Sequence, residues 1–218
     1  MQIINQNPTC LITGCSGYIG GFIAKRLISL NWQVFGITRQ NDTSPLNPQV
    51  RWIVADLNDQ KSDLEISKVL TKYGSLDAIF HCAGFSPDFT ILNLEQEDFQ
   101  LGLTLNFAAL QKLNQSLAPM LNQNGSIIHF GSRVSTVGNS GQIAYATAKG
   151  ILSDYTKRLA SELGPKNITV NMILPGVHPS EILGPHRQQI MENAKKSSLL
   201  NQLTNIEDVV NAVIFLLN

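Results

Sequence analysis

Residues 10–20 restrict the fold of this chain more than any other stretch. A short apolar strand, residues 10–12, leads into a turn that contains Gly14, Gly17 and Gly20, and an amphipathic helix follows. Glycines let a backbone approach a phosphate closely, and a helix amino terminus offers free N–H groups and a positive dipole end. The stretch therefore predicts a phosphate cradle. A plain tight turn stays the alternative, because the G-x-x-G-x-x-G spacing differs from the usual G-x-G-x-x-G fingerprint.

Strand and helix patterns alternate along the rest of the chain. Further apolar strands are expected at residues 33–38, 50–55, 78–82, 126–130 and 168–174, with helical patterns between them. This alternation predicts a parallel sheet with helices on both faces. We expect one α/β domain over residues 1–218, a Rossmann-like doubly wound sheet of six strands.

Two helix starts carry capping patterns. Asn93 with Gln96 is expected to cap the helix that begins near Glu95, and Thr204 with Glu207 to cap the last helix. The first of these helices bears an apolar stripe, with Asn106 off that stripe. The stripe residues are Phe99, Leu103, Leu110 and Leu117.

Composition excludes several classes of protein. Sixteen basic and sixteen acidic residues give a net charge of zero, so nothing indicates a nucleic-acid partner. No apolar run reaches the length of a membrane span, and the amino terminus does not resemble a signal peptide. Three unpatterned cysteines fit a reducing cytoplasm, and with His81 and His129 they lack a zinc-like spacing, so no metal is expected. The cysteines are Cys10, Cys15 and Cys82.

The end of the second expected strand bears on cofactor choice. NAD-binding folds usually place an acidic residue there for the ribose hydroxyls, whereas an arginine accommodates a 2′-phosphate. Arg39 stands at this position, and no acidic residue occurs until Asp42. The position favours NADP(H) over NAD(H), with a solvated loop arginine as the alternative.

Tyr145 and Lys149 form the pair that most strongly indicates chemistry. Residues at i and i+4 of a helix stand one turn apart on one face. An ammonium that close favours the phenolate, so Lys149 is expected to lower the pKa of Tyr145 and fit it for proton transfer to a carbonyl. An exposed helical pair without function is the alternative for these two residues alone.

The ordered set of motifs resembles the short-chain dehydrogenase/reductase family along nearly the whole chain. Tyr145 and Lys149 follow Ser132 by thirteen and seventeen residues, which is the family's spacing. The other matching features, in chain order, are Thr13-Gly14 with Gly17 and Gly20, Asp56-Leu57, Ala83-Gly84, Asn106, Gly131-Ser132 and Asn171 to Gly176.

The resemblance implies a role for each matching residue. Ser132 would bind the substrate carbonyl, with Ser135 as the weaker choice. Tyr145 would transfer the proton, Lys149 would hold the nicotinamide ribose, and Asn106 would fix a relay water. The implied cofactor contacts are Gly14, Ser16, Tyr18, Ile19, Arg39, Asp56, Leu57, Ala83, Gly84, Tyr145, Lys149, Pro175, Gly176 and Val177.

Three features depart from the family pattern. The glycine spacing resembles the family's extended branch, yet 218 residues leave no room for that branch's extra domain. His81-Cys82 precedes Ala83-Gly84 where the single-domain branch has two asparagines, and we expect His81 to be packed rather than catalytic. The usual seventh strand is absent, so either a partner covers the edge formed by residues 168–173 or the gene product is longer.

Two classes of function remain open from the sequence. We expect an NADP(H)-dependent reductase of a ketone, aldehyde or 3-oxoacyl group; the alternative is an NADP-binding sensor or hetero-oligomer subunit with little turnover. The resemblance implies a homodimer through the helices that bear Asn106 and Tyr145. His178, His186 and Arg187 are expected to be solvated loop residues, with contact to an anionic group as the alternative. Apolar residues expected to border the substrate are Phe85, Phe89, Val134, Val177, Ile182 and Leu183.

Overall fold

The computed structural model describes residues 7–39, 47–86 and 89–217. Residues 40–46, Asp42 among them, lie outside these ranges.

The described strands form one parallel six-stranded sheet in the order β3-β2-β1-β4-β5-β6, which confirms the predicted fold class. The strand order reverses between β1 and β4. In such sheets a ligand binds in the crevice outside the carboxyl ends of the strands at this switch point. The strands are β1 (Thr9–Thr13), β2 (Gln33–Thr38), β3 (Arg51–Val54), β4 (Leu76–His81), β5 (Leu121–Phe130) and β6 (Thr169–Ile173).

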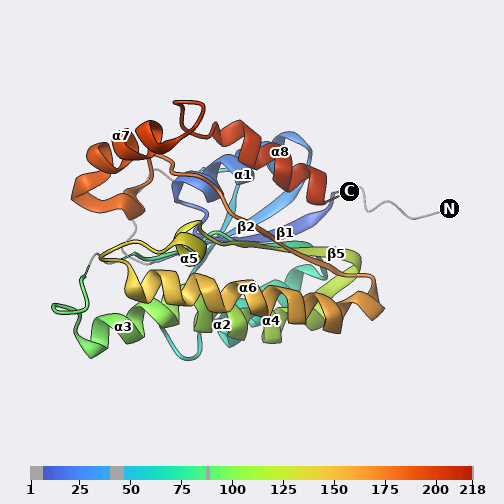
Figure 1. Ribbon diagram of the computed structural model, residues 1–218. Helices are drawn as coiled ribbons and strands as arrows, with labels where there is room; N and C mark the ends of the chain where they lie inside the picture. The colour runs from blue at the N-terminus through green and yellow to red at the C-terminus, as the bar shows by residue number, and fades with distance from the viewer. Residues whose placement is uncertain (1–6, 40–46, 87–88, 218) are drawn as a thin grey trace.

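Helices cover both faces of the sheet, as Figure 1 shows. On one face lie α1 (Tyr18–Ser29), α7 (Arg187–Ser197) and α8 (Ile206–Leu216). On the other lie α2 (Ser62–Leu70), α3 (Gln96–Leu103), α4 (Ala109–Leu117) and α6 (Ile143–Leu163). The short elements are η1 (Thr71–Tyr73), η3 (Ala118–Met120), α5 (Val134–Val137), η4 (Gly164–Lys166) and η5 (Glu181–His186).

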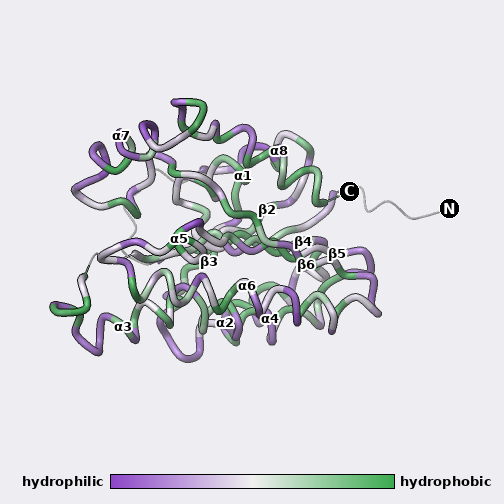
Figure 2. The backbone as a smooth tube through the Cα atoms, in the orientation of Figure 1, coloured by the Kyte–Doolittle hydropathy of each residue, from purple (hydrophilic) through white to green (hydrophobic). Residues whose placement is uncertain are grey.

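Each face of the sheet has its own apolar core. One core joins α1 and α8 to the sheet through side chains such as Ile23, Leu27 and Val213. The other joins α2, α4 and α6 through Ile66, Leu113 and Leu163. In Figure 2 the central strands are mostly apolar, whereas the helices alternate between apolar and polar residues. Packing on both faces holds the carboxyl ends of the strands in fixed positions.

A π-helical turn, η2 (Thr104–Ala108), joins α3 to α4. A π-turn holds more residues than an α-helical turn, so it rotates the side chains that follow relative to those before it. Asn106 lies in this turn and is 1% exposed, so its polar side chain is buried within the fold.

Both predicted helix caps are wrong. The N-cap of α3 is Glu95, without a side-chain cap, and the backbone N–H of Asn93 instead donates to the carbonyl of Thr90. The last helix begins one residue later than expected. Its cap is Asn205, whose side-chain oxygen accepts from the N–H of Glu207 at 3.1 Å. Either Thr204 or Asn205 satisfies the preference for a short polar side chain at this position.

Candidate active site

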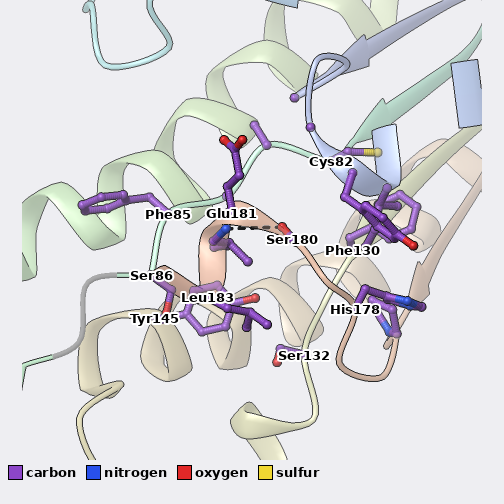
Figure 3. A pocket seen from close by; sticks show the side chains of 18 of the residues that line it. Cys82, Phe85, Ser86, Phe130, Ser132, Tyr145, His178, Ser180, Glu181 and Leu183 are labelled. Atoms are coloured by element: carbon purple, nitrogen blue, oxygen red, sulfur yellow. Dashed lines mark hydrogen bonds between the residues drawn. The ribbon is translucent and has the colours of Figure 1, made fainter. Parts of the chain in front are cut away.

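A cavity of about 1230 Å³ opens at the carboxyl ends of the strands. Loops after all six strands contribute to its wall, as do residues of η5 and α7. Figure 3 shows Glu181 and Leu183 of η5 at this wall. Every cofactor contact that the sequence predicts lies in this wall, as does Ser132. Asn106 does not line the cavity. The arrangement brings residues from positions 14 to 197 around one space large enough for a dinucleotide and a substrate.

The glycine-rich turn is shaped for close approach of a phosphate. Gly14 has a φ of +62°, and a Cβ there would lie 2.7 Å from the backbone nitrogen of Ala83. A side chain at Gly20 would collide with the carbonyl oxygen of Gly14. The N-cap of α1, Gly17, has no capping side chain, so the first-turn N–H groups have no side-chain acceptor there. These features fit the diphosphate of a dinucleotide cofactor.

Ser132 and Tyr145 face the same part of the cavity (Figure 3). Burial raises the pKa of Tyr145 above its ordinary value of 10, and the Ser132 side chain lowers it in part. The phenol is therefore protonated at neutral pH and able to donate. A carbonyl oxygen placed between these two hydroxyls would meet two donors.

Lys149 is buried at 3% exposure, and its Nζ donates to the carbonyl oxygen of Phe130 at 2.7 Å. Burial lowers the pKa of Lys149 from 10.5 to about 8. The Nζ lies 5.6 Å from the centroid of the Tyr145 ring. The expected lowering of the Tyr145 pKa by Lys149 does not occur among the described residues, because the ammonium is held at the end of β5 and burial dominates the pKa of the phenol.

The structure also distinguishes Ser132 from Ser135. The Ser135 hydroxyl donates to the carbonyl oxygen of Ser132 at 2.7 Å, and Ser135 does not line the cavity. Ser135 therefore braces the turn that carries Ser132.

Asn106 is held by three hydrogen bonds. Its Nδ2 donates to the carbonyl oxygens of Phe85 at 2.6 Å and Gly102 at 2.8 Å, and its Oδ1 accepts from the N–H of Phe85 at 3.1 Å. The side chain therefore ties the π-turn to the loop after β4. Both protons of the Asn106 amide nitrogen are therefore used, and none is left for a relay water. The predicted contact between Asn106 and a relay water stays a proposal, with the backbone of Asn106 as the part that would make it.

His81 is packed beneath the sheet in a closed hydrogen-bond chain. Its Nε2 donates to Asn114 Oδ1 at 2.8 Å, and Asn114 Nδ2 donates to His129 Nε2 at 3.2 Å. The remaining ring proton of His129 is then on Nδ1, which lies 2.8 Å from the Thr156 hydroxyl, and that hydroxyl donates to the carbonyl oxygen of Leu152. Burial lowers the pKa of His81 to about 4 and that of His129 to about 2. This confirms a packed His81.

The adenosine end of the cavity is less enclosed. Arg39 lines it but is exposed, directly after β2. Asp56 and Leu57, after β3, lie in the same wall.

Five of the six expected substrate-side residues line the cavity: Phe85, Val134, Val177, Ile182 and Leu183. Phe89 is the exception. Its N–H donates to the carbonyl oxygen of Gly141 at 2.8 Å and it bridges to Gln142, so it fastens two loops beside the cavity.

His178 was expected to be solvated, and that prediction is wrong. The residue is 5% exposed, whereas His186 and Arg187 are exposed as expected. Its ring stacks on Tyr18, and its Nε2 has no hydrogen-bond partner among the described residues. Sequence reasoning also missed Cys82 and Glu181 in the cavity wall. Position after a strand end was the available signal for Cys82.

Two classes of site do not occur in the described ranges. No group of three or more histidine, cysteine, aspartate or glutamate side chains is arranged to hold a metal ion. No described helix combines the length and apolar character that crossing a membrane requires.

The fold and the site define a class: a dinucleotide-binding sheet with a Ser/Tyr/Lys set at the carboxyl ends of its strands. Comparisons with known proteins agree. Residues 17–218 match a family model described as enoyl-(acyl carrier protein) reductase. The chain is 28% identical over 230 residues to the short-chain reductase protein NovJ of Streptomyces niveus, covering 97% of this chain and 87% of that protein.

Two further similarities support the same class. The chain is 32% identical over 212 residues to the 3-oxoacyl-(acyl-carrier-protein) reductase FabG of Rickettsia felis, covering 95% of this chain and 88% of that one. A short-chain dehydrogenase family protein from Francisella tularensis has a crystal structure that superposes with a TM-score of 0.87 at 26% identity, over 97% of this chain and 91% of that chain. The chain therefore belongs to the short-chain dehydrogenase/reductase family of NAD(P)-dependent oxidoreductases.

Proposed function

We propose that this protein is an NADP(H)-dependent reductase that converts a ketone, aldehyde or 3-oxoacyl group to an alcohol, with Tyr145 as the acid. The observation that carries the proposal is the position of Ser132 and Tyr145 together in the wall of the dinucleotide-sized cavity. The names of the FabG and NovJ relatives, which describe reductases, support the reductive direction.

The residues present fit each part of such a reaction. Ser132 holds the carbonyl oxygen and stabilises the negative charge that develops on it. Tyr145 delivers its phenolic proton to that oxygen, and its raised pKa keeps the proton in place at neutral pH. Lys149 binds the ribose hydroxyls next to the nicotinamide, and the nicotinamide supplies the hydride when bound.

NADP(H) is proposed over NAD(H) because of Arg39. A guanidinium makes charge-assisted hydrogen bonds to a phosphate, and the exposed arginine after β2 has room for the 2′-phosphate. The substrate end is bordered by Phe85, Val134, Ile182 and Leu183, which favours a fairly apolar carbonyl compound.

We also propose a homodimer through the helices that bear Asn106 and Tyr145, and a cytoplasmic location. Ile151 on α6 is 42% exposed, beside buried Leu152, so the helix has apolar surface beyond what the sheet covers. The three free cysteines are compatible with a reducing compartment. Light scattering should give twice the subunit mass of 23.9 kDa; a monomer would contradict the helix-pair interface, and a tetramer would contradict the dimer.

The test of function is NADPH oxidation against a panel of carbonyl compounds that includes ketones, aldehydes and 3-oxoacyl thioesters. Loss of NADPH absorbance with at least one member, absent in Ser132→Ala, supports the reductase. Tight NADPH binding without turnover on any member would instead support the alternative of a binding protein.

A further inference from the structure

The inference concerns His178, and it rests on the proposed function because it describes how the enzyme holds its cofactor. His178 lies in the loop after β6, two residues beyond Gly176. Its ring packs on Tyr18 with centroids 5.9 Å apart and planes 28° apart. Figure 3 shows His178 on the other side of the cavity from Tyr145. The imidazole is therefore remote from the proton-transfer pair.

Tyr18 fixes the ring relative to the phosphate cradle. It is the first residue of α1, directly after the uncapped N-cap Gly17. Tyr18, Gly17 and His178 all line the same cavity. A diphosphate bound at the amino terminus of α1 would lie next to Tyr18. His178 is thus brought from a distant part of the chain to the edge of the diphosphate position.

The hydrogen-bond state of His178 differs from that of the other buried histidines. His81 and His129 use their ring nitrogens in the chain through Asn114, whereas Nε2 of His178 is buried without a partner in the described ranges. Buried polar atoms in folded proteins are nearly always satisfied, so an exception calls for a ligand or a water. Burial also lowers the pKa of His178, which leaves a neutral ring with one N–H to donate.

We propose that His178 is a cofactor-binding residue whose ring turns about its Cβ–Cγ bond on the face of Tyr18 and donates a hydrogen bond to the diphosphate of the bound dinucleotide. The glycine-rich turn then holds the diphosphate from one side through backbone N–H groups, and His178 holds it from the other through a side chain.

Calorimetric titration of the full chain with ADP-ribose and with NADPH tests the contact. ADP-ribose contains the diphosphate but lacks the nicotinamide. His178→Leu should weaken both ligands by the same factor, about tenfold, which equals about 1.4 kcal/mol. His178→Gln, which retains a donor, should stay within about threefold of wild type. His186→Gln, an exposed histidine outside the cavity wall, is the matched control and should change neither affinity.

Two results would overturn the proposal. Weaker NADPH binding with unchanged ADP-ribose binding would place the contact at the nicotinamide. Unchanged binding of both ligands to His178→Leu would make the ring structural only. Neither measurement uses turnover, so the two proposals can fail separately. If the wild-type protein reduces carbonyl compounds and His178→Leu binds both ligands normally, only this inference is overturned. If no turnover is found but the predicted affinity loss is, only the reductase is overturned.

Nitrogen-15 NMR of the histidine rings follows the contact in the wild-type protein. The chain has four histidines, so the spectrum is simple, and His178→Gln assigns the signal. Addition of ADP-ribose should shift Nε2 of His178 and leave His81 and His129 in place. An unmoved His178 signal at saturating ADP-ribose would contradict the proposal.

Discussion

The two ends of the cavity are built differently. At the catalytic end, Lys149 is buried and hydrogen-bonded to the carbonyl of Phe130, and Tyr145 lies with Ser132 in the cavity wall. At the adenosine end, the cradle consists of backbone shaped by glycines, and Arg39, the arginine proposed to meet a 2′-phosphate, is exposed.

This difference separates chemistry from recognition. Groups that move protons must keep a fixed geometry, and packing on both faces of the sheet supplies it. Phosphate binding at a helix terminus depends on backbone N–H groups. These groups are present with many different side chains. Changes at the catalytic end should therefore alter turnover, and changes at the adenosine end should alter cofactor affinity alone.

The largest expected effect is at Tyr145. Tyr145→Phe keeps the ring and removes the proton, so turnover should fall at least about 100-fold, the lower range of what acid catalysis contributes. NADPH affinity, measured by calorimetry on the same variant, should change little. Near-normal turnover, or lost turnover together with lost NADPH affinity, would break the separation of the two ends.

The next effect concerns the histidine chain behind the catalytic end. The folded-state pKa of His81, about 4, lies below its ordinary value of 6.5, so the unfolded chain binds the extra proton first as pH falls. The contribution of neutral His81 to the free energy of unfolding is therefore fully present above pH 6.5. It is lost as the pH falls toward 4, and the loss is about 3 kcal/mol for His81 alone.

Urea unfolding between pH 7 and 4 measures this loss. His81→Gln should be less stable at pH 7 but show a shallower fall with acid, whereas His186→Gln should keep the wild-type profile. A wild-type slope in His81→Gln would show that this histidine does not carry the acid sensitivity.

At the adenosine end, Arg39→Ala should weaken NADPH binding by about 10- to 100-fold, because a charge-assisted contact contributes about 1.5–3 kcal/mol. NADH, which lacks the 2′-phosphate, should bind as before. Arg158→Ala is the control, since Arg158 is exposed on α6 in an ion pair with Asp154. Equal losses for both cofactors would remove the basis for NADP(H) preference.

The smallest expected effect is a gain in stability at the catalytic end. Lowering the Lys149 pKa from 10.5 to about 8 means that the buried ammonium destabilises the fold below pH 8, by about 3 kcal/mol before its hydrogen bond is counted. Lys149→Met should stabilise the cofactor-free protein by about 1–2 kcal/mol at pH 7. This advantage should shrink as pH rises from 8 to 10.5; thermal unfolding at several pH values decides it.

Much of the fold followed from pattern. Alternating apolar runs predicted the six parallel strands, although β5 begins at Leu121 rather than 126 because its first residues extend beyond the buried apolar stretch. Neither cap was placed correctly. For the last helix, adjacent Thr204 and Asn205 both suit a helix start, and only the backbone conformation decides between them.

The site was predictable where a motif fixed it and not where tertiary contacts did. Spacing brought Ser132, Tyr145 and Lys149 to one cavity as expected. The π-turn that buries Asn106 has no local pattern. His178 looked solvated among prolines and glycines, and only its stack on Tyr18, 160 positions away, makes it part of the wall. The pKa of Tyr145 depended on burial, which spacing does not reveal.

The central claim is that hydride passes from NADPH to a substrate carbon in this cavity while Tyr145 supplies the proton. NADPH deuterated at both nicotinamide C4 positions tests it directly, with a carbonyl compound that the wild-type protein consumes. Mass spectrometry of the product should find one deuterium on the carbinol carbon, and Tyr145→Phe should form at least about 100-fold less of it in the same time. An alcohol without deuterium, or equal product from Tyr145→Phe, would contradict the account.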